Sequence, residues 1–226
     1  MTKPGSAQTP LRIPVLRTRL NQFLIRFVLN KSMFQIDQKF PDFSLEIYDP
    51  ASDDVGKISL PDFKGKWLVL FFYPADFTFV CPTELVDLQR RHDDFKKLNA
   101  EIVSVSTDTV HTHKGWVEAE QILKVIKYKM AADHTGKVSR DLGIYYEESG
   151  KSHRAAFIID PDGVLRSAQI VADDIGRSAG EIFRQLKALD FVRKNPGHVC
   201  PASWDEGAQT LEPSIKKVGK VYKELK

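Results

Sequence analysis

Residues 66–73 read KWLVLFFY, a short and nearly continuous apolar run. Such a run is typical of a β-strand buried on both faces, because a strand with one wet face alternates apolar and polar residues. Both faces of its sheet must then be covered, and in α/β proteins helices provide that cover. The run therefore predicts an α/β domain built around a central strand.

The rest of the chain supplies further strands and helices in alternation. Three more strands are predicted at residues 101–107, 155–160 and 164–171, the last two forming a hairpin across a Pro-Asp-Gly turn. Helices are predicted at residues 82–98, 110–128 (at least in part), 137–142 and 175–193. The order β-α-β-α-α-β-β-α indicates a single domain with a mixed sheet.

Positive charge is concentrated at the N-terminus. Residues 1–36 contain six lysines and arginines and no acid. Because the whole chain carries +3, the remaining residues carry −3 and give no electrostatic reason to expect nucleic acid.

Residues 11–31 are Arg-rich and amphipathic, as in an organellar transit peptide, but an upstream extension or a helix packed on the body fits equally. The expected location is cytoplasmic, or an organelle if residues 1–32 are a leader.

The chain has two cysteines, Cys81 and Cys200, and no CxxC motif. A dithiol motif of the thioredoxin type and a zinc knuckle are therefore not expected. The two thiols are either unrelated or two halves of one redox reaction.

The surroundings of Cys81 favour chemistry over inert packing. Pro82 suits the first turn of the helix predicted to begin here, and a helix N-terminus favours an anion such as a thiolate. The spacing Pro74-x-x-x-Thr78-x-x-Cys81 would bring these residues to one side of a near-helical turn. Thr78 can then offer a hydroxyl to the thiolate or to a bound oxygen, and Pro74 can shield the site from water.

Residues 74–84, PADFTFVCPTE, resemble the active-site motif of the peroxiredoxins, in particular the alkyl hydroperoxide reductase C branch of the two-cysteine type. Further segments resemble that branch in the same order: STDTVHTHKGW (106–116), VIKYKM (125–130), RAAFIIDPDG (154–163), DIGRSAGE (174–181) and HVCPASWDEG (198–207). The resemblance runs from about residue 33 to the C-terminus. It implies a thioredoxin-like fold in the peroxiredoxin variant, with helices flanking a central mixed sheet and a C-terminal tail that crosses to a partner subunit.

The resemblance also implies roles for individual residues. Cys81 would be the peroxidatic cysteine, whose thiolate attacks hydrogen peroxide or a small organic hydroperoxide and becomes a sulfenic acid. Thr78 and Arg154 would hold the peroxide, Glu84 would orient Arg154, and Arg177 would complete the network. Tyr73, Phe77 and Trp116 are expected to pack around the pocket.

Cys200 would be the resolving cysteine of a partner subunit, forming a Cys81–Cys200 disulfide between two chains. The implied assembly is a homodimer, forming decamer rings. No cofactor or metal is expected, since His111, His113 and His198 lack a ligand-like spacing. A thioredoxin or an AhpF-like flavoprotein reductase would reopen the disulfide.

Rival functions on the same scaffold are a peroxide sensor or relay and a holdase chaperone; a one-cysteine peroxidase with an idle Cys200 is a further alternative. The expected divisions are a basic extension (1–32), a peroxidase domain (33–195) and an arm with the resolving cysteine (196–226).

One departure from sensitive, eukaryotic-type relatives carries a hypothesis. The chain lacks their Gly-Gly-Leu-Gly insertion and their C-terminal Tyr-Phe pair, since it ends KVYKELK. The cap over the Cys81 helix should be weak, so disulfide formation should outrun over-oxidation.

Overall fold

The computed structural model describes residues 34–224, which belong to one compact unit, Phe34–Lys226. The N-terminal segment, for which the sequence leaves a leader, an extension or a packed helix open, lies outside the described residues.

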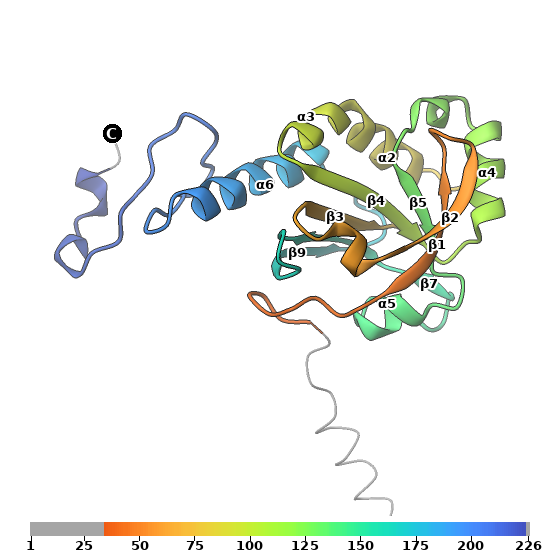
Figure 1. Ribbon diagram of the computed structural model, residues 1–226, viewed down its shortest axis with the longest axis horizontal. Helices are drawn as coiled ribbons and strands as arrows, with labels where there is room; N and C mark the ends of the chain where they lie inside the picture. Colours follow the sequence, from red (N-terminus) through yellow and green to blue (C-terminus); the bar gives the residue numbers. More distant parts are fainter. Residues whose placement is uncertain (1–33, 225–226) are drawn as a thin grey trace, which may run out of the picture. The chain divides into compact units, whose positions relative to one another are not determined.

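A seven-stranded mixed sheet forms the centre of this unit (Figure 1). Its strands lie in the order β2-β1-β5-β4-β3-β8-β9, with β3, β4 and β5 parallel and the other neighbours antiparallel. The bounds are β1 Ser44–Asp49, β2 Asp54–Ser59, β3 Trp67–Phe72, β4 Ala100–Ser106, β5 Lys129–Ala132, β8 Arg154–Ile159 and β9 Leu165–Val171. The predicted mixed-sheet α/β fold is confirmed.

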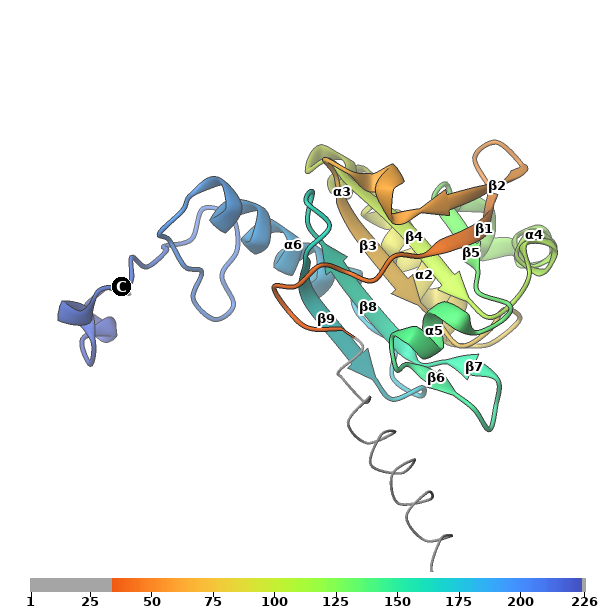
Figure 2. The same ribbon diagram turned by 60° about the horizontal axis from the view of Figure 1, so that its bottom comes forward.

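The strand predicted from KWLVLFFY is β3, and all six of its residues are buried. Because side chains alternate along a strand, Val69 and Phe71 enter one apolar layer while Leu70 and Phe72 enter the other. The first layer is covered by the helices α2 (Cys81–Arg90), α3 (His92–Lys97), α4 (Val110–Ala119) and α6 (Ala179–Lys194). The second is covered by α5 (Lys137–Asp141) and the segment around Phe40 and Phe43, and Figure 2 shows α5 on this face.

The helix predicted over residues 82–98 is two helices, α2 and α3, which meet at Arg91 (φ −106°, ψ 5°). The prediction missed the break because the apolar period continues across it. Leu88, before the break, and Phe95, after it, are both fully buried.

The helical prediction for residues 110–128 is correct only to Ala119. Glu120 is extended (φ −89°, ψ 112°), and a 3-10 turn, η2 (Gln121–Val125), follows it. The chain then enters β5, a strand the sequence did not reveal because its four residues, KMAA, carry little strand signal.

Strands β1 and β2 were also missed, as was the small hairpin of β6 (Tyr145–Tyr146) and β7 (Lys151–Ser152). Four of the six residues of β2 are exposed, so no buried face is visible in its sequence. The hairpin predicted from residues 155–171 is confirmed as β8 and β9.

The last helix begins at Ala179 rather than at residue 175, because the hydroxyl of Ser178 caps it by accepting a hydrogen bond from the Glu181 amide. Beyond α6 the chain forms an arm with two 3-10 turns, η3 (Ile215–Lys217) and η4 (Val221–Lys223). None of the helices between residues 34 and 224 is long and apolar enough to span a membrane.

Candidate active site

Cys81 is the first residue of α2 and its side chain is fully buried. It follows the loop that leaves the carboxyl end of β3. Pro82 occupies the first turn, where its missing N–H costs no hydrogen bond. The sulfur thus lies at a helix start and in a dry environment, as the sequence predicted.

Arg154, the first residue of β8, reaches the sulfur directly. Its Nη1 donates to Cys81 Sγ at 3.3 Å and to Glu84 Oε2 at 2.6 Å, and its Nε donates to the carbonyl of Asp173 at 2.7 Å. Burial opposes the charge of the guanidinium. The hydrogen bond to Cys81 and the negative charges of Cys81 and Glu84 outweigh burial, so the pKa of Arg154 is raised.

Glu84 joins Arg154 to a second arginine. Arg177 donates its amide and its Nε to Glu84 Oε1 at 2.7 and 2.9 Å. Its guanidinium also lies 3.5 Å from the ring centroid of Phe71, in a cation–π contact. One buried carboxylate therefore fixes two arginines, and the three residues lie together as the family resemblance implied.

Thr78 and Pro74 lie in the loop between β3 and α2, and Pro74 is buried. The Thr78 hydroxyl donates to the carbonyl of Ala75 at 2.9 Å. Among the hydrogen bonds of residues 34–224, none joins Thr78 to Cys81. A hydroxyl that donates once keeps acceptor lone pairs, so Thr78 can still accept a hydrogen bond from a substrate.

The same loop contains a buried polar contact that the sequence analysis missed. Asp76 accepts hydrogen bonds from the Tyr73 hydroxyl at 2.7 Å and faces His113 Nδ1, also at 2.7 Å. Tyr73 and Trp116 are buried as expected, with ring centroids 6.0 Å apart, whereas Phe77 is 59% exposed. His113 was set aside because its spacing matched no ligand pattern; a partner 37 residues away leaves no local signal.

Cys200 lies on the arm, away from these groups. Its Sγ is 3.8 Å from the carbonyl of Ala188 in α6, and burial raises the pKa of the thiol. It lines a hollow of about 290 Å³ together with Ser167 of β9 and Gln185 of α6. Both cysteines are free thiols.

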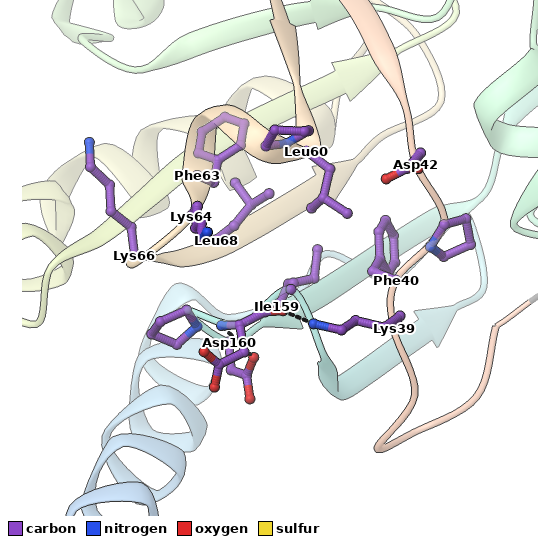
Figure 3. A pocket seen from close by; sticks show the side chains of 15 residues that line it. Lys39, Phe40, Asp42, Leu60, Phe63, Lys64, Lys66, Leu68, Ile159 and Asp160 are labelled. Carbon is purple, nitrogen blue, oxygen red and sulfur yellow. Dashed lines mark hydrogen bonds between the residues drawn. The ribbon is translucent and has the colours of Figure 1, made fainter.

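The site is not a large cavity. A hollow of about 680 Å³ opens at the other end of β3, between Phe63, Leu68 and Ile159, with Lys39 donating across it to the carbonyl of Asp162 (Figure 3). Neither Cys81 nor Arg154 lines it. A buried thiol without a large pocket suits a small reactant.

No group of acids, histidines and cysteines within residues 34–224 is arranged to hold a metal ion. The group that donates to Cys81 Sγ is the guanidinium of Arg154.

The comparison with known proteins identifies the family. The model of the AhpC/TSA family matches residues 36–168. The chain belongs to the AhpC/TSA family.

Relatives match over nearly their whole length. Alkyl hydroperoxide reductase C of Staphylococcus aureus is 44% identical over 189 residues, covering 84% of this chain and 100% of that protein. The crystal structure of Enterococcus faecalis AhpC matches with a TM-score of 0.71 at 42% identity, covering 74% of this chain and 99% of that one. The reduced 2-Cys peroxiredoxin of Plasmodium vivax matches with a TM-score of 0.76 at 33% identity, covering 80% and 94%.

These matches confirm the predicted resemblance to two-cysteine peroxiredoxins and the thioredoxin-like fold. The chain is a thiol-dependent peroxidase, and the sensor and chaperone alternatives are not favoured.

Proposed function

We propose that Cys81 reduces hydrogen peroxide and small organic hydroperoxides. Its thiolate attacks the terminal oxygen of the O–O bond; that bond breaks, the other oxygen leaves with a proton as water or an alcohol, and the sulfur becomes a sulfenic acid. The observation that carries the proposal is the 3.3 Å hydrogen bond from Arg154 to the sulfur of a fully buried cysteine at a helix start.

The surrounding residues have separate tasks. Arg154 stabilises the charge that develops on the leaving oxygen, because a fixed cationic donor in a dry site is worth more than one in water. Glu84 and Arg177 hold Arg154 in place. Thr78 accepts a hydrogen bond from the peroxide, and Pro74 shields the sulfur from bulk water.

The second step uses Cys200 of a partner subunit. Its thiol condenses with the sulfenic acid, releasing water and forming an intersubunit Cys81–Cys200 disulfide. Because Cys81 is fully buried, the start of α2 must open before the two sulfurs can bond. A dithiol donor, a thioredoxin or an AhpF-like flavoprotein reductase, then restores both thiols.

An isologous homodimer suits this step. Cys200 lies beside β9, which is an edge strand of the sheet and therefore has an unpaired side. We propose that residues 33–195 act as the peroxidase domain and residues 196–226 as an arm that serves the partner. Dimers then assemble into a decamer.

We propose the cytoplasm as the working compartment, in keeping with the bacterial relatives. Residues 1–32 as an import signal are the alternative. Fusions of the full chain and of residues 33–226 to a fluorescent protein separate the two: identical cytoplasmic distribution supports the proposal, and organellar signal from the full chain alone contradicts it.

The direct test is non-reducing electrophoresis with mass mapping after one equivalent of hydrogen peroxide. The expected product is a dimer linked through Cys81 and Cys200. Cys81→Ser should give no reaction, and Cys200→Ser should stop at a sulfenic acid. A monomer with oxidised Cys81 and free Cys200 would remove the resolving role, and no reaction at either thiol would remove the proposal.

A further inference from the structure

A buried polar cluster holds the loop that carries Pro74 and Thr78. Tyr73 donates to Asp76 Oδ1 at 2.7 Å, and His113 Nδ1 lies 2.7 Å from Asp76 Oδ2. The side chains of Asp76 and His113 are 0% exposed. The Asp76 amide also donates to Asp108 Oδ2 at 2.8 Å, so the loop is fastened at both backbone and side chain.

The proton count of this cluster is fixed by its acceptors. The second ring nitrogen of His113, Nε2, faces the carbonyl of Ala131 at 3.1 Å, and a carbonyl only accepts, so Nε2 carries a proton. The 2.7 Å contact between Nδ1 and Asp76 Oδ2 needs a second proton, since otherwise two lone pairs would oppose each other. The pair thus holds two protons, either as imidazolium and carboxylate or as neutral imidazole and carboxylic acid.

The loop between the cluster and the thiol is short and strained. Asp76 stands two residues before Thr78 and five before Cys81. Phe77, between Asp76 and Thr78, has φ +53°, a left-handed conformation that a bulky residue adopts only when its surroundings impose it. Its ring lies 6.1 Å from that of Trp116 in α4, the helix that also carries His113.

We propose that Asp76 and His113 are positioning residues for peroxide reduction, which hold the Thr78 loop in register with Cys81 through a shared, buried proton. This inference rests on the proposed function of Cys81. It adds Asp76 and His113 to the residues on which the reaction depends. Neither touches the sulfur or, in the proposed reaction, the peroxide.

Because of its electrostatic surroundings, the contact between Asp76 and His113 depends on the shared proton. The titratable groups facing the pair are Tyr73 and Asp108, and neither supplies a positive charge. Burial raises the pKa of Asp76; the contact with His113 opposes that rise, and the charge of Asp108 adds to it. Burial and the neighbouring Asp76 raise the pKa of Tyr73 well above its usual value, so Tyr73 stays a donor.

The sign of the pH effect follows from the raised pKa of Asp76. The folded chain holds this proton more tightly than the unfolded chain, so its contribution to stability is complete at low pH and is lost as the pH rises through the folded value. Loss of the shared proton leaves a lone pair of Nδ1 against the carboxylate and loosens the loop. A cysteine alone would only react faster as the pH rises, because more of it is thiolate.

The test measures the second-order rate of Cys81 oxidation by hydrogen peroxide in the full chain, by rapid alkylation and mass spectrometry, from mildly acid to alkaline pH. Asp76→Ala and His113→Ala should lower the rate by about ten- to a hundredfold, as expected for a displaced active-site group.

Asp76→Asn is the rescue variant, because its side-chain amide can accept a hydrogen bond from Tyr73 and donate one to Nδ1 of a neutral imidazole. It should react at nearly the original rate and lack the decline that the unchanged chain shows as the pH rises. His92→Ala is the matched control, since His92 is also a buried histidine but lies in α3, with its ring 6.1 Å from that of Tyr128.

The outcomes separate the inference from the proposed function. No oxidation of Cys81 in the unchanged chain overturns the function and the inference with it. Normal oxidation in folded His113→Ala overturns the inference alone. If the alanine variants do not fold, the comparison of Asp76→Asn with the unchanged chain decides: absence of the decline in Asp76→Asn supports the shared proton, and coincident pH profiles overturn it.

Discussion

At the scale of single residues, the charges around Cys81 support the proposal that this thiol attacks the peroxide. Arg154 and Arg177 contribute two positive charges and Glu84 one negative charge, so the buried cluster carries a net +1 that an ionised Cys81 neutralises. Burial strengthens this attraction, because no water screens it. Near Cys200 the charge of Arg184 favours the thiolate, but burial outweighs it and raises the pKa of the thiol. The two thiols are therefore suited to different steps, attack and resolution.

Arg154→Lys should lower the rate of Cys81 oxidation by about a hundred- to a thousandfold, the usual loss when one charge-stabilising donor is removed. A lysine ammonium is a point donor on a flexible stem and cannot bridge the sulfur, Glu84 and the carbonyl of Asp173 in one plane. The measurement is the reaction with hydrogen peroxide under single-turnover conditions. Arg140→Lys, at an exposed ion pair with Glu147, is the control and should react normally. An Arg154→Lys enzyme as fast as this control would remove the proposed role of the guanidinium.

At the scale of elements, α6 holds the arm that carries Cys200. Trp204 is buried, its ring centroid lies 5.1 Å from that of Phe191, and its carbonyl accepts a hydrogen bond from Arg184. Trp204 is therefore an anchor between the arm and α6, beside the ion pair of Lys187 with Asp205. Its loss should free the segment around Cys200.

Trp204→Ala should increase the rate at which Cys200 is alkylated by iodoacetamide. Burial raises the pKa of Cys200, so exposure lowers that pKa toward its usual value and increases the thiolate fraction at a given pH. Mass mapping of labelled Cys200 over time measures the effect. Tyr222→Ala is the matched control, because Tyr222 is an aromatic residue of the same arm that is 73% exposed. Equal labelling of both variants would mean that Trp204 does not anchor the arm.

The elements also reveal what a sequence can predict. Strand β3 is apolar along its length and β4 and β8 are mostly apolar, so their burial can be predicted from the residues themselves. β1 is held by pairing with β2 and β5, and β2 by pairing with β1, and no local sequence pattern predicts these pairings. The motif around Cys81 predicted a role for Cys81 and Thr78, and the family resemblance added Arg154, whose Nη1 lies 3.3 Å from Cys81 Sγ. Asp76 and His113 were not predictable, because their contact depends on the packing of α4 against the β3–α2 loop.

At the scale of the whole molecule, exposed aromatic residues next to the site indicate an interface. Phe79 is 94% exposed and Phe77 is 59% exposed, both within four residues of Cys81. Soluble proteins rarely leave large apolar side chains clustered in water, and such clusters mark association surfaces. The proposed decamer would bury them and would also hold the Thr78 loop.

Phe79→Glu should therefore shift the assembly toward dimers, because a carboxylate in an apolar interface is costly to desolvate. Size-exclusion chromatography with light scattering of the reduced protein measures the mass. Val55→Glu is the control, since Val55 is 54% exposed on β2, which lies at the opposite edge of the sheet from β9. Identical masses for both variants would exclude Phe79 from the interface.

At this scale too, the chain between α4 and β5 lacks the Gly-Gly-Leu-Gly insertion of sensitive relatives, so the cap over the peroxidatic helix is expected to be weak. A sulfenic acid at Cys81 has two fates: the start of α2 opens and Cys200 condenses with it, or a second peroxide oxidises it to a sulfinic acid. A weaker cap speeds opening, so the disulfide should predominate until peroxide is in large excess. Mass spectrometry of Cys81 across a peroxide series measures the ratio of disulfide to sulfinic acid. Cys200→Ser is the matched control, because it removes the competing step and should accumulate sulfinic acid at far lower peroxide. If the unchanged chain over-oxidised as readily as that variant, opening would be slower than the second oxidation, and a weak cap could not be the property that sets the tolerance of this enzyme.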